Sequence, residues 1–469
     1  MLRASSRHVL RQRSDDKLGA RLALSAATSE GAGPRTADVP AWLAERAMAN
    51  EFRVEPIPFS RLDGWLFDGE TGNLVHRTGR FFTVEGLRVG VTDRSGCESP
   101  RHWQQPILNQ PEIAILGLLA KEFDGVPHIL MQAKMEPGNC NLLQLSPTVQ
   151  ATWSNYTRVH AGAPVRYLEY FTETDSSRVL ADVLQSEQGS WYDRKSNRNI
   201  IAETNGAVPE HDDFCWLTLG QIAELLTQDN VINMDARSAL SCLPFDTGDS
   251  MAETSDAGLL SWFTGMRARY DVRAERIPLA DVKDWETDDW SIHHRDGRYF
   301  RIIAASVDAG SREVTRWTQP LLEPCGVGIA CFFSRRIGGV VHVLAQAKPE
   351  AGFLDAVEIA PTVQCTPSNY THLPAEQRPR YLDRVLGAGP DAIRYSAVHS
   401  EEGGRFRSAQ GRYLIIEAED DLDPPPGYCW VTTAQLTWLI QHGHYLNMQA
   451  RTLLACLNLL TMAKKKAMA

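Results

Sequence analysis

The sequence predicts an α+β fold, with helices layered on a mixed sheet, and it predicts that this unit occurs twice. Three observations support this. The stretch from Gln132 to Tyr156 returns 214 residues later as Gln346 to Tyr370 without a gap, which indicates a tandem duplication. Short runs that alternate apolar and polar residues are typical of strands. Longer segments with apolar residues three or four positions apart are typical of helices.

Three strands are expected in the first copy, close to the repeated stretch. Ile113–Leu119 and Ile129–Ala133 are short apolar runs, and Phe123-Asp124-Gly125 between them has the composition of a turn. Leu145–Thr152 alternates strictly between apolar and polar residues, which predicts a third strand.

Three helices are expected after these strands. Ser176–Gln185 has apolar residues at helical spacing, and so do Leu219–Leu226 and Met234–Leu243. Asn233 directly precedes the last segment, and asparagine is a preferred N-cap because its side chain accepts from a free backbone N–H. Strands followed by helices favour packed α/β layers over an all-β barrel.

The repeat divides the chain into two modules. Residues 1–38 are rich in Arg, Ser, Ala and Gly without apolar periodicity, which predicts a disordered leader. Shared motifs place the first module at 39–243 and the second at 259–463. Residues 244–258 are polar and rich in Gly, Asp, Ser and Thr, as linkers are. Residues 464–469 form a basic tail.

Composition excludes several classes of protein. The chain has 469 residues and a net charge of −10, which argues against a broad surface for nucleic acid or anionic membranes. Its apolar runs are too short to span a membrane. The nine cysteines form no C-x-x-C pair, which favours reduced thiols in a cytoplasmic protein. Clustered zinc ligands, a P-loop and a dinucleotide fingerprint are lacking, so neither metal nor NAD is expected.

Polar side chains recur at every second position of two predicted strands, which places them on one face of each. They are Gln132, Lys134 and Glu136 on one strand and Thr148, Gln150 and Thr152 on the next. Two such stripes on neighbouring strands would form the floor of a pocket, although a solvated sheet face also alternates. The pocket is favoured because the second copy repeats the same residues as Gln346, Lys348, Glu350, Thr362, Gln364 and Thr366.

Two further segments carry candidate residues. The third strand ends in Ser154, Asn155 and Tyr156, of which the first two are ordinary turn residues. A loop tyrosine, by contrast, can stack on a base or donate to a ketone oxygen. Ser186–Asn199 combines a glycine with Arg and Lys, which suits a diphosphate, although a basic solvated loop has the same composition. Its charged residues and tyrosine are Glu187, Tyr192, Arg194, Lys195 and Arg198, and the second copy has Glu401, Arg405, Arg407 and Arg412.

These motifs resemble those of a known enzyme family. KMEPGN, LQLSPTVQAT-x-SNYT and LQSEQGSW in the first half, with PTVQCTP-x-NY and SEEGGRF in the second, are similar to the NDP-hexose 2,3-dehydratases of actinobacterial deoxysugar pathways. The resemblance spans most of both modules. It implies two fused modules similar in fold to Nudix hydrolases, and a homodimer. It also implies removal of the C2 hydroxyl of dTDP-4-keto-6-deoxy-D-glucose as water, which leaves a 3,4-diketo-2,6-dideoxy sugar nucleotide for glycosylated natural products such as antibiotics.

The Nudix signature for Mg²⁺ is degenerate in both copies. Only Glu187 and Gly189 match it in the first, and only Glu401 and Gly403 in the second. A lone carboxylate is a poor Mg²⁺ site, so metal-assisted hydrolysis of a diphosphate is not expected.

The implied reaction needs three functional groups. The C4 ketone acidifies the C3 hydrogen, so a base, an acid at the C2 hydroxyl and a donor to the C4 oxygen are required. Glu136 and Glu187 are the candidates for base and acid, in either order. Lys134, Tyr156 or Tyr192 would polarise the ketone. The route requires no metal and no redox cofactor.

The remaining candidates bind substrate. Arg194, Lys195 and Arg198 are assigned to the diphosphate. Trp103 or Trp191 would stack on thymine, although core packing is an alternative for either. The other candidates for the dTDP-linked hexose are Gln132, Thr148, Gln150, Ser154, Asn155, Gln105 and Gln188.

The first module is expected to be the catalytic one. It keeps Asn139, Asn141 and Tyr192, where the second has Phe353, Asp355 and Phe406. The second module would hold a weakened or vestigial site made of Gln346, Lys348, Glu350, Thr362, Gln364, Asn369, Tyr370, Glu401, Arg405 and Arg407. Two alternatives stay open: a Mg²⁺-dependent, Nudix-type hydrolase of nucleotide sugars, and a non-enzymatic protein that binds them.

Overall fold

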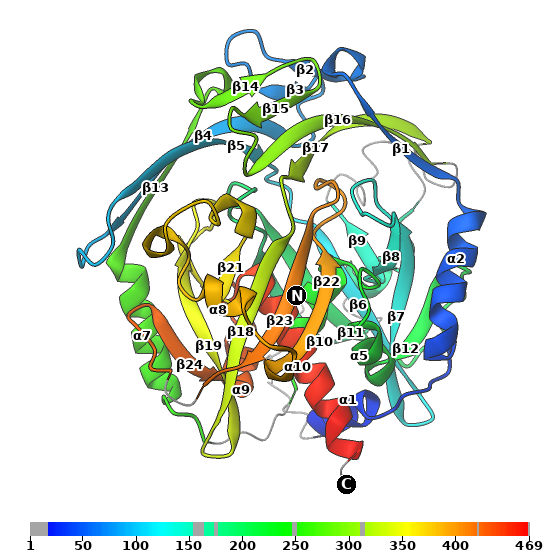
Figure 1. Ribbon diagram of the computed structural model, residues 1–469. Helices are drawn as coiled ribbons and strands as arrows, with labels where there is room; N and C mark the ends of the chain where they lie inside the picture. The colour runs from blue at the N-terminus through cyan, green and yellow to red at the C-terminus, as the bar shows by residue number, and fades with distance from the viewer. Residues whose placement is uncertain are drawn as a thin grey trace, which may run out of the picture.

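The computed structural model describes residues 17–152, 164–172, 177–245, 251–309, 315–419 and 422–467. A seven-stranded mixed sheet forms the centre of the first module (Figure 1). Its order is β10-β11-β6-β7-β12, with β8 on β7 and β9 on β6. Only β11 and β6 run parallel. The strands are β6 (Ile115–Phe123), β7 (Val126–Met135), β8 (Leu143–Ser146), β9 (Val149–Ala151), β10 (Arg178–Ser186), β11 (Ser196–Glu203) and β12 (Phe214–Thr218).

The second module repeats this sheet with the order β22-β23-β18-β19-β24, with β20 on β19 and β21 on β18. Its parallel pair is β18 and β23, the counterpart of β6 and β11. The strands are β18 (Gly328–Ile337), β19 (Val340–Pro349), β20 (Val357–Ala360), β21 (Val363–Cys365), β22 (Ile393–Ser400), β23 (Gln410–Glu417) and β24 (Tyr428–Thr432). Mixed sheets with helices, present twice, confirm the predicted fold class; the likeness to Nudix proteins stays a prediction.

Two five-stranded sheets lie above the module cores, and each contains strands of both modules (Figure 1). In one, β1 of the first module pairs antiparallel with β16 of the second. In the other, β13 of the second module pairs with β4 of the first. The strands are β1 (Phe52–Ile57), β2 (Trp65–Phe67), β3 (Leu74–His76), β4 (Thr83–Asp93), β5 (Arg101–Asn109), β13 (Tyr270–Ile277), β14 (Trp285–Thr287), β15 (Ser291–His294), β16 (Phe300–Ala309) and β17 (Arg316–Pro324). The modules predicted as contiguous segments therefore exchange strands.

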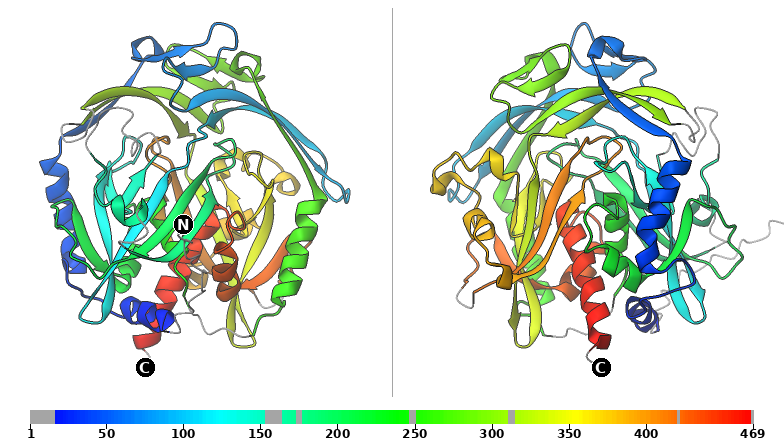
Figure 2. Two further views of the ribbon diagram at one scale, coloured as in Figure 1. Left: turned by 180° about the vertical axis from the view of Figure 1, so that it is seen from behind. Right: turned by 45° about the vertical axis from the view of Figure 1, so that its right-hand side comes forward.

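Helices cover the sheets and fill the space between the modules. Figure 2 shows α10 between the two seven-stranded sheets. One apolar core joins residues of both modules, among them Leu240 on α6 and Leu453 on α10. The α-helices are α1 (Leu18–Ala26), α2 (Val39–Ala49), α4 (Glu169–Thr172), α5 (Leu219–Leu225), α6 (Met234–Ser241), α7 (Asp256–Arg269), α8 (Leu382–Leu386), α9 (Thr433–Ile440) and α10 (Met448–Ala467), and the 3₁₀ helices are Thr36–Asp38, Phe59–Arg61, Leu279–Asp281, Pro367–Asn369, Ala375–Gln377 and Pro390–Ala392. Within the described residues no helix is long and apolar enough to cross a membrane.

Several predicted elements agree with the structure. Helices α5 and α6 lie where helical spacing predicts them, and the Asn233 side chain accepts from the N–H of Ala236 as the expected N-cap. Strand β6 begins two residues later than predicted and ends four residues later, and β7 extends its predicted strand at both ends. The predicted third strand is broken at Pro147 into β8 and β9, because proline cannot donate to a sheet ladder.

The helix predicted over Ser176–Gln185 is wrong: this segment is strand β10. Its pairing with β11 shifts register between Val179 and Ala181. Beyond the bulge burial alternates as in any strand: Ala181 and Val183 are buried, whereas the apolar Val179 and Leu184 are exposed. The resulting apolar spacing imitates a helix.

The predicted leader is also corrected. Residues 17–38 are not a disordered leader, because helix α1 buries Leu22, Ser25 and Ala26 against the first module. The Ser25 hydroxyl donates to the Pro127 carbonyl oxygen at 2.5 Å. Helix α10 continues to Ala467, so most of the basic tail is helical. Helix α7 begins at Asp256 inside the predicted linker, and residues 246–250 of that linker lie outside the described part.

Candidate active site

Four side chains of the first module form a connected polar group, which we call the first tetrad: Lys134, Glu136, Gln150 and Asn233. Gln150 Nε2 donates to Glu136 Oε1 at 2.7 Å, and Asn233 Nδ2 donates to Gln150 Oε1 at 3.3 Å. Lys134 Nζ lies 3.9 Å from Glu136 Oε1 and 3.4 Å from the Gln150 carbonyl oxygen. Alternation along β7 brings the lysine and glutamate to one face, and the cap of α6 supplies the asparagine.

The second module contains the same group, the second tetrad: Lys348, Glu350, Gln364 and Asn447. Gln364 Nε2 donates to Glu350 Oε1 at 3.1 Å, and Asn447 Nδ2 donates to Gln364 Oε1 at 2.6 Å. Lys348 Nζ lies 3.2 Å from Glu350 Oε1. The two polar stripes thus meet through glutamine and glutamate in both copies, as the alternation predicts.

The threonines of the stripes serve the backbone instead. Thr148 is buried, and its hydroxyl donates to the Leu130 carbonyl oxygen at 2.5 Å and accepts from the Leu119 N–H at 2.9 Å. Thr362 repeats both contacts in the second copy. These hydroxyls bridge two strands where they diverge, so neither is available to a substrate. Gln132 and Gln346 are half-buried on β7 and β19.

Glu187 lies at the end of β10 with its carboxyl group buried and half satisfied. Asn197 Nδ2 donates to its Oε1 at 2.5 Å, whereas its Oε2 has no hydrogen-bond partner among the described residues. Burial raises the pKa of Glu187 to about 7, although the ammonium of Lys195 opposes the shift. The carboxyl group is therefore close to half protonated at neutral pH.

Sequence reasoning missed two residues of this group, Asp235 and Glu402. Asp235 on α6 is buried, and Glu402 of the second module is half-buried. Burial raises the pKa of Asp235 well above its usual range, and the charges of Glu187 and Glu136 raise it further. Asn139 Nδ2 lies 3.4 Å from Glu136 Oε2, within donating distance. Asp235 Oδ1 and Asn139 Oδ1 are buried without partners among the described residues. Comparison of the two copies could have pointed to Asp235 and Glu402, because the equivalent positions of the other copy carry the uncharged residues Gln449 and Gln188.

The counterpart of Glu187 in the second module is fully satisfied. Tyr413 Oη donates to Glu401 Oε1 and Gln188 Nε2 donates to Glu401 Oε2, both at 2.8 Å. Gln188, predicted to bind substrate in the first site, therefore lies at the second one. The second module also has Phe353, Ala409 and Gln449 in place of Asn139, Lys195 and Asp235. This side of the molecule consequently offers fewer ionisable groups.

The predicted diphosphate group is not assembled. Lys195 is buried and donates to Asn197 Oδ1 at 2.9 Å and to the Glu112 carbonyl oxygen, and burial lowers its pKa. Arg198 pairs with Asp182 at 2.6 Å on the outer surface of β11. Arg194 is exposed, in a turn with φ of 49°. Arg194 stands in the turn before β11, Lys195 is buried and Arg198 lies at the surface, so the three cations do not converge.

The aromatic and glutamine candidates hold the loop that carries Tyr192. Trp191 packs edge-on against Phe406 at 4.6 Å between ring centroids, as the core alternative predicted. Trp103 is partly exposed and donates to Gln105 Oε1 at 2.8 Å, and Gln105 Nε2 donates to the Ser190 carbonyl oxygen at the same distance. These contacts hold the loop that carries Tyr192 rather than open a thymine site.

Other candidates lie elsewhere or outside the described residues. Tyr192 Oη donates to Glu402 Oε2 at 3.0 Å, so this hydroxyl is occupied. Arg405 acts electrostatically on Tyr192, Lys195 and Glu402 and thus belongs to the first site, not the second. Arg407 pairs with Glu323 at 3.8 Å. Asn369 Oδ1 accepts from the Tyr299 N–H, and Tyr370 packs against the second module's core. Ser154, Asn155 and Tyr156 fall outside the described part.

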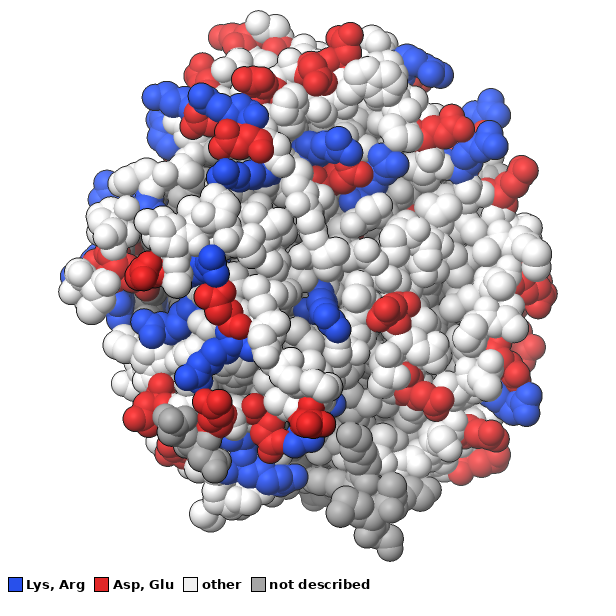
Figure 3. Space-filling model, in the orientation of Figure 1, with Lys and Arg blue, Asp and Glu red and all other residues white. Residues whose placement is uncertain are grey.

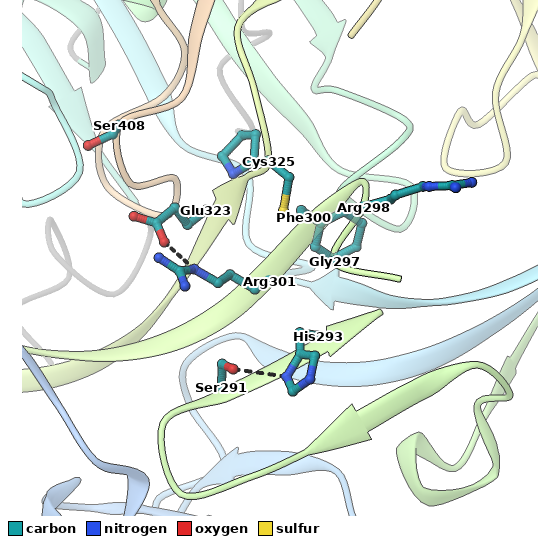
Figure 4. Close-up of a pocket in the computed structure, with 10 residues that line it drawn as sticks. Ser291, His293, Gly297, Arg298, Phe300, Arg301, Glu323, Cys325 and Ser408 are labelled. Carbon is teal, nitrogen blue, oxygen red and sulfur yellow. Dashed lines mark hydrogen bonds and ion pairs between the residues drawn. The ribbon is translucent and has the colours of Figure 1, made fainter. Parts of the chain in front are cut away.

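A surface cleft of about 530 Å³ lies along β15, β16 and β17 (Figure 4). It contains the ion pair of Arg301 and Glu323, with His293 and Arg298 beside it. We place the chemistry at the tetrad and Glu187 rather than in this cleft, because the unpartnered buried oxygens lie there. The face of the molecule shown in Figure 3 carries acidic and basic side chains interspersed.

Metal ligands are not grouped in the described part of the chain: no three His, Cys, Asp or Glu side chains there are placed to share an ion.

Comparison with known proteins matches the family model for NDP-hexose 2,3-dehydratase to residues 36–243 and again to 256–457. Three relatives carry the name dTDP-4-dehydro-6-deoxy-alpha-D-glucopyranose 2,3-dehydratase. A protein of Amycolatopsis orientalis is 61% identical over 93% of both chains. A protein of Streptomyces violaceoruber is 50% identical over 91% of this chain and 97% of its own chain. A protein of Saccharopolyspora spinosa is 49% identical over 90% of this chain and 91% of its own chain.

Proposed function

The chain belongs to the NDP-hexose 2,3-dehydratase family, and from this premise we propose that its first module carries out the dehydration. The reaction removes the C2 hydroxyl of dTDP-4-keto-6-deoxy-D-glucose as water and leaves the 3,4-diketo-2,6-dideoxy sugar nucleotide. One observation carries the choice of module. Glu187 Oε2 is buried without a partner among the described residues, whereas both oxygens of Glu401 are occupied. Buried polar atoms require partners, and a substrate hydroxyl would supply one.

Glu136 is the base in this proposal. Its carboxylate accepts from Gln150 at 2.7 Å and lies 3.9 Å from the Lys134 ammonium. It takes the proton from C3, and the electron pair of that bond moves to the C4 oxygen as an enolate. Lys134 is partly exposed beside it and is the cation that stabilises the enolate oxygen.

Glu187 is the acid. Because burial raises its pKa to about 7, a large share of the enzyme carries the proton at neutral pH. The enolate collapses, the C2–O bond breaks, and the hydroxyl leaves as water with the proton of Glu187. The remaining enol at C3 becomes a ketone by moving its proton to C2. Electrons therefore balance within the sugar, and we propose that neither a nicotinamide nor a metal is required.

Tyr192 is not assigned to the ketone, because its hydroxyl donates to Glu402. We further propose that the substrate is the dTDP-linked hexose, that the protein forms a homodimer and that it is cytoplasmic. Light scattering on a sizing column measures the oligomer. Chelator-treated enzyme incubated with the sugar nucleotide tests the cofactors: product lighter by one water in metal-free buffer is expected, whereas thymidine monophosphate formed only with Mg²⁺ would favour a hydrolase.

Exchange of the C3 hydrogen in heavy water distinguishes the base from the acid. Glu187→Gln should exchange C3–H for deuterium without dehydrating the sugar, because the base remains and the acid is lost. Glu136→Gln should do neither. Exchange by Glu136→Gln and none by Glu187→Gln would reverse the two roles. Mass spectrometry of the recovered sugar nucleotide reads both outcomes in one sample.

A further inference from the structure

A turn of the second module covers the first-module site. The Gly138 N–H donates to the Gly403 carbonyl oxygen and the Ser408 N–H donates to the Gly138 carbonyl oxygen, both at 2.7 Å. A Cβ at Gly403 would lie 2.9 Å from Glu136 Cβ and 2.3 Å from Asn139 Oδ1. Only glycine allows this approach, so the turn that begins at Glu402 lies directly against the proposed base.

Glu402 is the half-buried carboxyl group of this turn. The Gly404 N–H donates to its Oε1 at 2.7 Å and the Tyr192 hydroxyl donates to its Oε2 at 3.0 Å. The charge of Glu136 acts on Glu402, and the charge of Glu402 acts on Glu187. Glu402 thus reaches both carboxyl groups that the dehydration requires, although it comes from the other copy of the repeat.

We propose that Glu402 is a positioning residue of the first-module site, which holds Tyr192 in place and adds a carboxyl group beside Glu136, Glu187 and Asp235. The inference rests on the proposed function, since it assumes that this site catalyses the reaction. It also gives the second module a task that does not need its own tetrad to turn over substrate. The equivalent position of the first module is Gln188, so the second site receives no such carboxyl group.

The carboxyl group has a defined electrostatic effect. Buried carboxyl groups near one another cannot all be ionised, so each makes the others harder to deprotonate. Glu402 therefore helps to keep the proton on Glu187, against Lys195 and Arg451, which favour its loss. Tyr192, Asn197 and Asp235 are the other polar groups around Glu187. Removal of Glu402 should make Glu187 a stronger acid.

Glu402→Gln tests this, because glutamine keeps the shape and is the residue that the other module has at this position. Its control is Glu358→Gln, a buried glutamate whose counterpart in the first module is Gln144. Glu402→Gln should lower kcat by about 10- to 100-fold. It should also move the high-pH limb of the kcat profile down by about one pH unit. Glu358→Gln should leave the limb in place.

Several outcomes would overturn the inference. A wild-type kcat and pH profile for Glu402→Gln would do so, and so would an equal shift of the limb in Glu358→Gln. If Glu402→Gln does not fold, Tyr192→Phe removes the same hydrogen bond, and a wild-type kcat there would reject the positioning role. Glu136→Gln separates the two proposals: turnover in that variant means that the proposed function has failed, whereas its inactivity beside a normal Glu402→Gln rejects Glu402 alone.

Discussion

Arg451 on α10 donates from Nη2 to the carbonyl oxygen of Ser186 at 2.5 Å, and Ser186 directly precedes Glu187. The first module returns the contact, because Arg237 Nη2 donates to the Ser400 carbonyl oxygen at 2.6 Å, in front of Glu401. Each copy therefore holds the peptide ahead of the other copy's glutamate. The two modules depend on each other at the site and not only through the strands that they exchange.

The two tetrads should differ sharply in activity. Glu136→Gln should lower kcat by about 10²- to 10⁴-fold, as loss of a general base does. Glu350→Gln makes the matched change in the second tetrad and should leave kcat little changed. Steady-state assays of product formation compare the two. Loss of turnover in Glu350→Gln with none in Glu136→Gln would assign catalysis to the second module.

The pH dependence of turnover should report the proton on Glu187. A general acid acts in its protonated form, and the pKa of Glu187 is about 7, so kcat should fall as pH rises through that value. The profile of kcat between pH 6 and about 9 measures this limb. Ammonium and guanidinium groups lose their protons at higher pH, so a limb above about pH 9 would point to Lys134 instead.

Glu358 should make stability depend on pH. Burial raises its pKa to about 8, above its usual value of 4.5, while the Ser186 hydroxyl donates to its Oε2 at 2.6 Å and opposes the shift. The folded state then binds the proton more tightly than the unfolded state, so this group lowers stability as pH rises from about 4.5 to 8. Glu358→Gln should be more stable by on the order of 2 kcal/mol at pH 8.5 and unchanged near pH 4. Urea unfolding at both pH values measures the free energy of unfolding of the variant and the wild type. An equal gain in stability at the two pH values would contradict the link to the proton on Glu358.

The crossed arginines should separate stability from activity. Arg451→Ala and Arg237→Ala each leave buried carbonyl oxygens without a donor and should each cost about 3–5 kcal/mol of folding free energy. Arg451→Ala should in addition lower kcat, because Ser186 positions Glu187. Arg237→Ala should reduce kcat less, since it holds the residue before Glu401. The measurement is kcat at equal folded fraction. If Arg451→Ala and Arg237→Ala then lose kcat equally, the predicted difference between the two arginines is wrong.

Local pattern placed Lys134, Glu136 and Gln150 on two polar stripes and Asn233 at a helix N-cap, but it did not place Asn233 in the site. Alternation along one strand places Lys134 and Glu136 together, and the cap preference of Asn233 places it at the start of α6. The same reasoning misplaced Lys195 and Arg198, because neighbours along an extended chain point in different directions. It also misread β10, where exposed Val179 and Leu184 together with buried Ala181 and Val183 imitate the apolar spacing of a helix.

The sequence by itself determined that the protein is duplicated, that each copy is a mixed sheet with helices, and which reaction family its motifs fit. Tertiary structure alone decided which residues of the two copies meet. Glu402 reaches Glu136, and Gln188 reaches Glu401, because each copy's turn crosses to the other's sheet. Contacts over some 200 to 270 residues of chain follow from how apolar faces and strand edges pack, and no local pattern encodes them.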